Sequence, residues 1–194
     1  MKRIILLLAI VISGAVQTVR AQDVALKTNL LADGLLNPNL GLEIGLASRW
    51  TLDISGQFNT WTLSHNRRWK HWLVQPEARY WFCDRFSGHF VGLHAHGGQY
   101  NVGGLKNGIS FLGSDLSKLS DYRYEGWFAG AGIAYGYAWI LGRHWNLEAE
   151  IGIGYAYTVF DQYRCAGCGK RVSEDNRHHY FGPTKAAINL VYVF

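Results

Sequence analysis

Cysteine, proline and long apolar runs are all scarce in this 194-residue chain. Its three cysteines are too few for a disulfide-stabilised scaffold. Its three prolines leave long stretches free to form regular structure. Beyond the first residues no apolar run reaches about 18 residues, the length that a membrane-spanning helix needs. A disulfide-rich domain and a helical membrane protein are therefore excluded.

The N-terminal segment has the pattern of a secretory signal peptide. Lys2 and Arg3 give it a positive start, an apolar run covers residues 4–12, and Val19-Arg20-Ala21 is a small-x-small cleavage site before Gln22. We therefore expect a signal peptide at residues 1–21 and one mature domain at residues 22–194. No cysteine follows the expected cut, so a lipoprotein anchor is not indicated.

Strong charge of one sign is also missing from the expected mature domain. The whole chain has a formal net charge of +5, but the leader contains three of the basic residues and no acidic residue. Without it, 16 basic residues stand against 14 acidic ones. A balance of about +2 gives no indication of nucleic-acid binding.

Glycine and aromatic residues, in contrast, are abundant: 23 glycines, 8 tryptophans, 11 tyrosines and 9 phenylalanines. Such a composition suits a β-protein with an aromatic exterior better than a helical bundle. Apolar and polar residues alternate in segments of about ten, separated by turn residues. We predict eight strands, at residues 25–32, 40–46, 50–58, 71–82, 89–100, 124–141, 144–157 and 184–194. Pro76 falls inside the fourth strand and predicts a local bulge or bend.

The last predicted strand has one apolar face and ends in an aromatic residue. Its period-two row is Thr184, Ala186, Ile188, Leu190, Tyr192 and Phe194. Such an ending resembles the closing strand of bacterial outer-membrane β-barrels, whose terminal aromatic is recognised by the barrel assembly machinery. We expect it to pair with the first strand and close a barrel.

The connections between predicted strands alternate in length. Short turns follow strands two, four and six, whereas longer segments follow strands one, three, five and seven, the last being a loop at residues 160–182. Short periplasmic turns and long outward loops are typical of outer-membrane barrels. The sequence therefore predicts an all-β, eight-stranded antiparallel up-and-down transmembrane β-barrel in the outer membrane of a Gram-negative bacterium, in contact with lipid and lipopolysaccharide. A soluble lipocalin-like barrel would have the opposite pattern, an apolar lumen and a polar exterior.

Polar residues occupy the row that would face the lumen. Eight strands leave an interior just wide enough for side chains, so we expect a packed polar network and not a pore. An alternating row of small residues on strands six and seven would make room for long side chains. The expected lumen residues are Lys27, Glu43, Asp53, Glu77, Arg79, His94, His96, Glu148, Glu150 and Lys185.

Two cysteines lie in the last outward loop. Cys165 and Cys168 form a Cys-x-x-Cys pair, and His178 and His179 follow ten residues later. Together they have the donor types of a zinc site, although adjacent histidines diverge and make poor joint ligands. A Cys165–Cys168 disulfide in an oxidising compartment is the favoured interpretation, and a redox pair is a third. Cys83 is expected in a turn at the other end.

Two further features have weaker chemical meaning. His94 and His96 share a face near a serine-containing loop, as in a lipid-modifying enzyme, but no fixed Ser/His/acid spacing is present. We therefore expect no catalytic residues and no cofactor, apart from the zinc alternative. The basic run at residues 65–70 fits either contact with lipopolysaccharide phosphates or a solvated hairpin tip.

Several segments resemble an uncharacterised family of small outer-membrane proteins in Bacteroidetes, often encoded near fimbrial genes. The matching pieces are residues 27–31, 37–43, 71–81, 126–132, 165–169 and 180–186. The resemblance implies the barrel fold and an association with fimbriae, but no activity. The primary hypothesis is a non-enzymatic outer-membrane barrel that supports surface structure, with fimbrial assembly or anchoring as the role that the resemblance implies. The alternatives are a lipid-modifying enzyme and a metal-binding surface loop.

Overall fold

The computed structural model describes residues 23–63, 67–103, 122–164 and 169–194. The expected signal peptide and Gln22 lie outside these residues. The described elements are β1 (Val24–Asn29), α2 (Leu30–Gly34), β2 (Asn39–Ala47), β3 (Trp50–Leu63), β4 (Arg67–Trp81), β5 (Gly88–Gly103), β6 (Tyr122–Ile140), β7 (Trp145–Arg164) and β8 (Arg171–Val193).

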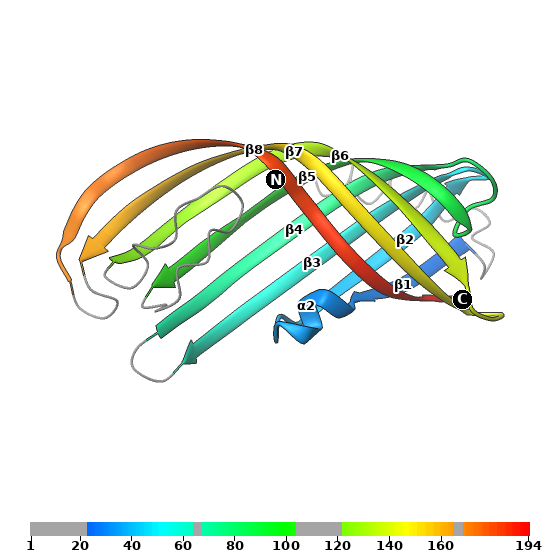
Figure 1. Ribbon diagram of the computed structural model, residues 1–194, viewed down its shortest axis with the longest axis horizontal. Helices are drawn as coiled ribbons and strands as arrows, with labels where there is room; N and C mark the ends of the chain where they lie inside the picture. Colours follow the sequence, from blue (N-terminus) through cyan, green and yellow to red (C-terminus); the bar gives the residue numbers. More distant parts are fainter. Residues whose placement is uncertain (1–22, 64–66, 104–121, 165–168) are drawn as a thin grey trace, which may run out of the picture.

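The eight strands form one closed antiparallel sheet in which each strand pairs with the next along the chain and β8 returns to β1 (Figure 1). The closing ladder runs from Ala25↔Val193 to Asn29↔Asn189. The prediction of eight antiparallel strands, with the last strand closing on the first, is therefore confirmed.

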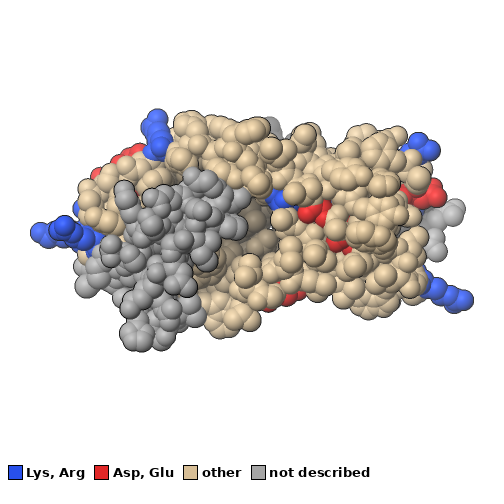
Figure 2. All heavy atoms as spheres, viewed as in Figure 1, with Lys and Arg blue, Asp and Glu red and all other residues tan. Residues whose placement is uncertain are grey.

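The alternation of residues along each strand sets the two faces of the ring. Leu93, Ile133 and Ile151 lie on the outer face and are each more than 60% exposed. The inward rows hold buried polar side chains on β5 and β7 and small residues on β6. On the face in Figure 2, Lys and Arg side chains project mainly at the two ends of the molecule, and the wall between them is largely uncharged. No helix among the described residues is long and apolar enough to cross a membrane.

Several predicted boundaries are wrong. The β3 strand continues to Leu63 and β4 begins at Arg67, beyond the predicted ranges 50–58 and 71–82. The first strand ends at Asn29, because the Asn29 side chain accepts a hydrogen bond from Leu31 N (3.1 Å) and caps the short helix α2. The expected loop at residues 160–182 is mostly strand, since the β7–β8 ladder continues outward through Phe160↔Asn176. Register shifts in this hairpin interrupt the period-two alternation that sequence inspection relies on.

One of these register shifts moves Thr184 out of its expected row. Gly152 pairs with Lys185 but Ile153 pairs with Pro183, so Thr184 is the extra residue of a bulge. Its hydroxyl lies 2.9 Å from His94 Nε2, inside the ring. Thr184 therefore does not continue the outward row that begins at Ala186.

Pro76 affects the sheet differently from the prediction. The β4–β5 register is the same on both sides of it, with Val74↔Gly97 and Glu77↔His94, but Gln75 and Pro76 form no pair with β5. Proline has no N–H to donate, so rungs are missing where a bulge or bend was expected.

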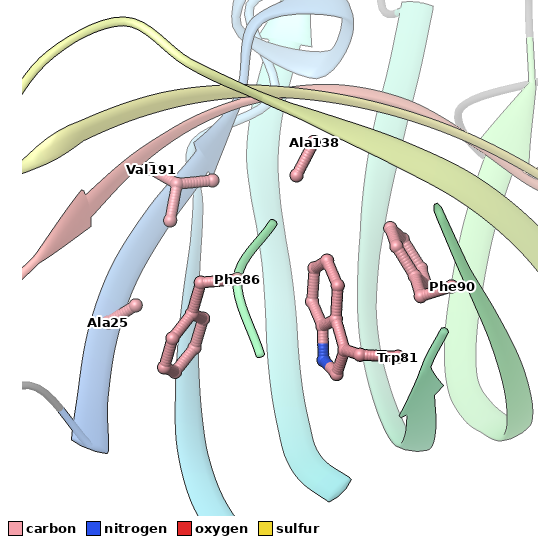
Figure 3. Packing of buried hydrophobic residues seen from close by; sticks show 6 residues of the cluster. All are labelled: Ala25, Trp81, Phe86, Phe90, Ala138 and Val191. Atoms are coloured by element: carbon pink, nitrogen blue, oxygen red, sulfur yellow. The ribbon is translucent and has the colours of Figure 1, made fainter. Parts of the chain in front are cut away.

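An apolar cluster closes one end of the interior (Figure 3). Trp81 and Phe90 pack with ring centroids 4.6 Å apart. Phe86, from the turn between β4 and β5, points in beside them, and Asn146 Nδ2 donates to its carbonyl (2.7 Å). Ala25, Ala138 and Val191 complete the cluster, which separates the charged interior from this end of the ring.

Candidate functional site: a buried charge network

The interior next to the apolar cluster contains eight charged side chains, none more than 7% exposed. They come from six different strands and meet because each lies on the inward row of its strand. The carboxylates are Glu43, Asp53, Glu77, Glu148 and Glu150, and the cations are Lys27, Arg79 and Lys185.

Arg79 is the centre of this charge network. Its guanidinium is fully buried and lies within 2.6–3.1 Å of carboxylate oxygens from five residues of β2, β3, β4 and β7. Its Cζ also lies 4.6 Å from the centroid of the Phe90 ring. The planar group presents five N–H donors in fixed directions, and this geometry lets one cation hold together carboxylates from opposite parts of the ring.

The two lysines extend the network across the closing strands. Lys27 on β1 contacts Glu43 and lies 3.3 Å from Asp53. Lys185 on β8 lies 2.7 Å from Glu77 and 3.0 Å from Glu150. Every carboxylate of the network therefore has a cationic partner, and the side chains fill the interior at this height.

A pair of histidines lies next to the charge network, on the side away from the apolar cluster. The His94 and His96 ring centroids are 5.7 Å apart, and both rings lie over glycines of β6: a Cβ at Gly132 would be 2.8 Å from His94 Nε2. The small-residue row thus makes room for these rings. The Nδ1 atoms of both histidines and Nε2 of Gln75 are buried without a hydrogen-bond partner among the described residues.

Thr184, His94 and Glu77 lie in the order of a nucleophile, a base and an acid. Thr184 Oγ1 is within hydrogen-bond distance of His94 Nε2, but His94 Nδ1 is 3.7 Å from Glu77 Oε2. That separation is too long for a hydrogen bond, so the described geometry lacks the link that would orient the base.

The structure places all ten residues of the expected lumen set inside the ring, in contact as one connected group. Sequence inspection missed the neutral members. Thr51 donates to Glu43 and accepts from Trp81 Nε1 (2.9 Å), and Asn189 donates to Glu148 (2.7 Å). Each lies an even number of residues from a charged inward residue on the same strand and therefore faces the interior. That spacing is the signal that could have identified them.

The proposed metal ligands are only partly described. Cys165 and Cys168 lie outside the described residues. His178 and His179 are neighbours in β8 and point to opposite faces of the sheet, and His179 Nδ1 contacts the Tyr155 hydroxyl. Among the residues that the structure describes, no group of three or more His, Cys, Asp or Glu could hold a metal ion.

Other residues singled out in the sequence have varied positions. Cys83 is exposed in the turn after β4, near the apolar cluster. The serine-containing segment at residues 104–121 and residues 65 and 66 of the basic run lie outside the description. Lys70 lies in the half of β4 that is farther from the apolar cluster.

Comparison with known proteins identifies a family for this chain. The model of a family described as "Protein of unknown function (DUF3575)" matches residues 4–194. No curated protein and no solved structure matches the chain. The expected membership of an uncharacterised family is thus confirmed.

Proposed function

Because the chain belongs to the DUF3575 family, whose function is unknown, we propose a function from its architecture: a non-enzymatic β-barrel of the bacterial outer membrane with a closed polar lumen. The observation that carries the proposal is the distribution of polarity. Charged residues are buried inside the ring and apolar ones cover its outside, as lipid surroundings require. A water-soluble barrel needs the reverse arrangement.

The connections support one orientation in the membrane. The β2–β3, β4–β5 and β6–β7 turns lie at the end with the apolar cluster, and each links strands that end within a few residues of each other. At the other end β7 and β8 continue beyond the bulge at Thr184. Short turns face the periplasm in such barrels, so the extended strands would project from the cell.

The filled interior favours a supporting role over transport. The Arg79 network and the Trp81–Phe90 cluster occupy successive heights of the lumen, leaving the projecting hairpins as the parts available to a partner. We propose that these hairpins support surface structure, with fimbrial assembly or anchoring as the specific role that the family resemblance suggests.

Fractionation together with gel mobility tests the proposal. The mature protein is expected in the outer membrane, and unheated samples should migrate faster than boiled ones because the closed sheet resists detergent. Recovery of the protein in the soluble periplasm, or identical mobility before and after boiling, contradicts it. Pull-down from solubilised outer membranes then tests for fimbrial or other surface partners.

A lipid-modifying enzyme is the second candidate, and the contact of His94 with the bulged Thr184 favours it. This candidate predicts a lipid modification in cells that produce the wild-type protein. Thr184→Val and His94→Gln should each abolish that modification without reducing the amount of folded protein. Unchanged lipid composition in both variants excludes it.

A metal-binding loop is the third candidate, based on the donor types of Cys165 and Cys168. It predicts zinc in the purified protein that is lost in the Cys165→Ser, Cys168→Ser double variant. A protein without zinc whose two thiols are unreactive until reduced indicates the disulfide instead.

A further inference from the structure

The outer wall over β4, β5 and β6 is hollowed into an apolar groove of about 460 Å³. Strand register explains its shape. At one height Trp72, Gln99 and Trp127 stand side by side; at the next lie Val74, Gly97 and Ala129. Small residues thus follow two tryptophans on the outer face. The next outward residues, Ala95 and Ala131, are also small, and the bulky pair Leu93 and Ile133 then ends the hollow.

The groove lies where the sheet is least complete. Its lining includes Pro76, Ala95 and His96, at the rungs missing between β4 and β5. Along β5 the lining extends from Ala95 to Gln99, four residues or roughly 13 Å along the strand. The lining of the groove is almost wholly apolar.

A second, more polar pocket of about 390 Å³ adjoins it on the side away from the end with the apolar cluster. The two share Trp72, Gln99 and Trp127, and Trp72 Nε1 donates to Gln99 Oε1 (3.1 Å) across the boundary. Lys70, paired with Asn101, lines the second pocket one row further out. The lining therefore changes from apolar to polar within one row of residues, at the level of Trp72 and Trp127.

We propose that the two pockets form one lipid site, in which an acyl chain of an outer-leaflet lipid lies in the groove and Lys70 binds the phosphate of its headgroup. This inference rests on the proposed membrane location. An amphiphile with a zwitterionic headgroup matches an apolar hollow joined to a polar pocket that is lined by Lys70 and Glu125, and tryptophans are enriched at the interface between hydrocarbon and headgroups. The groove also opens on the apolar outer wall of the ring, so a chain can enter it directly from the bilayer.

Two glycines at the same height allow a matched test. A Cβ at Gly97 would meet nothing nearer than Phe128 O at 3.6 Å, so Gly97→Leu should fold and fill the groove. Gly56 lies on the same outward row through Val74, and its Cβ would be 3.8 Å from Leu73 O. It does not line the groove, so Gly56→Leu adds the same side chain beside the site.

Native mass spectrometry of the full-length protein purified in mild detergent measures binding, with phosphatidylethanolamine and diacylglycerol as probes. The wild type and Gly56→Leu should each retain one phosphatidylethanolamine, and Gly97→Leu should retain at least tenfold less. Lys70→Gln should lower the preference for phosphatidylethanolamine over diacylglycerol several-fold, because diacylglycerol has no phosphate.

Equal retention by Gly97→Leu and Gly56→Leu overturns the proposal, as does a wild type that binds no lipid. A change in subunit number in Gly97→Leu alone overturns it in favour of contact between two copies of the chain. Gel mobility before and after boiling, measured on the same samples, distinguishes failure of the lipid site from failure of the proposed membrane location. Heat-modifiable protein without selective lipid binding refutes only the lipid site, whereas protein that is not heat-modifiable refutes the membrane proposal as well.

Discussion

At the scale of single residues, Arg79 has the largest structural role in the interior. Burying several carboxylates is costly unless each is paired and hydrogen-bonded, and here one guanidinium contacts five of them. Removing this cation leaves Glu43 and Glu148 with Lys27 alone, and Glu77 and Glu150 with Lys185 alone.

We expect Arg79→Met to lower the free energy of unfolding by about 3–5 kcal/mol, the usual cost of breaking a buried ion pair from one side. The measurement is the urea midpoint of protein refolded into lipid vesicles. Arg143→Met, in the exposed β6–β7 turn, is the control and should match the wild type. An Arg79→Met midpoint equal to that of the control would show that the network contributes nothing to stability.

The inward glycines are a second feature at this scale. A Cβ at Gly132 would be 2.5 Å from Ile153 O and 2.8 Å from His94 Nε2. Gly132→Val should therefore destabilise the protein by about 1–3 kcal/mol through overpacking, measured by the same urea midpoint. Gly56→Val adds the same atoms on the open outer face and should have little effect; equal losses in both variants would contradict the packing argument.

At the scale of elements, β1 forms the least extensive ladders of the ring, with four residue pairs to β2 and five to β8. β1 has six residues and β8 has 23. The Asn29 side chain continues the ladder beyond the end of β1, since its Oδ1 accepts from Ile188 N (3.2 Å) and its Nδ2 donates to Ala186 O (3.4 Å). One side chain thus caps α2 and bonds to the edge of β8.

We expect Asn29→Ala to cost about 1–2 kcal/mol, because it removes both the helix cap and the contacts with β8. Asn29→Asp keeps the acceptor and loses only the donor, so its loss should be smaller. Thermal unfolding followed by heat-modifiable mobility measures both variants. The interpretation fails if Asn29→Ala unfolds at the wild-type temperature.

At the scale of the whole molecule, two layers close the interior: an apolar cluster at one end and the charge network beside it. Phe86 reaches the first layer from a turn, so a single substitution there leaves the second layer in place.

The protein should therefore conduct no ions in planar bilayers, and neither should Phe86→Ala. The Arg79 network fills the ring at the next height and lacks the open path of a pore. Single-channel recording at high salt is the measurement, with a known porin as the positive control. Discrete conductance steps from the wild type would contradict a closed lumen.

The amino-acid sequence alone indicated the eight strands and the face that most of their residues take, because period-two alternation is a local property that an open or closed sheet preserves. It therefore identified Lys27, Glu77 and Arg79 as inward residues and predicted that the last strand pairs with the first. The tertiary structure decided which residues meet. Register across the ring brings Arg79 to five carboxylates, the bulge turns Thr184 onto His94, and the missing rungs at Pro76 open a groove in the wall. These features depend on the register between paired strands, and a one-residue shift there changes the partners without changing the local pattern.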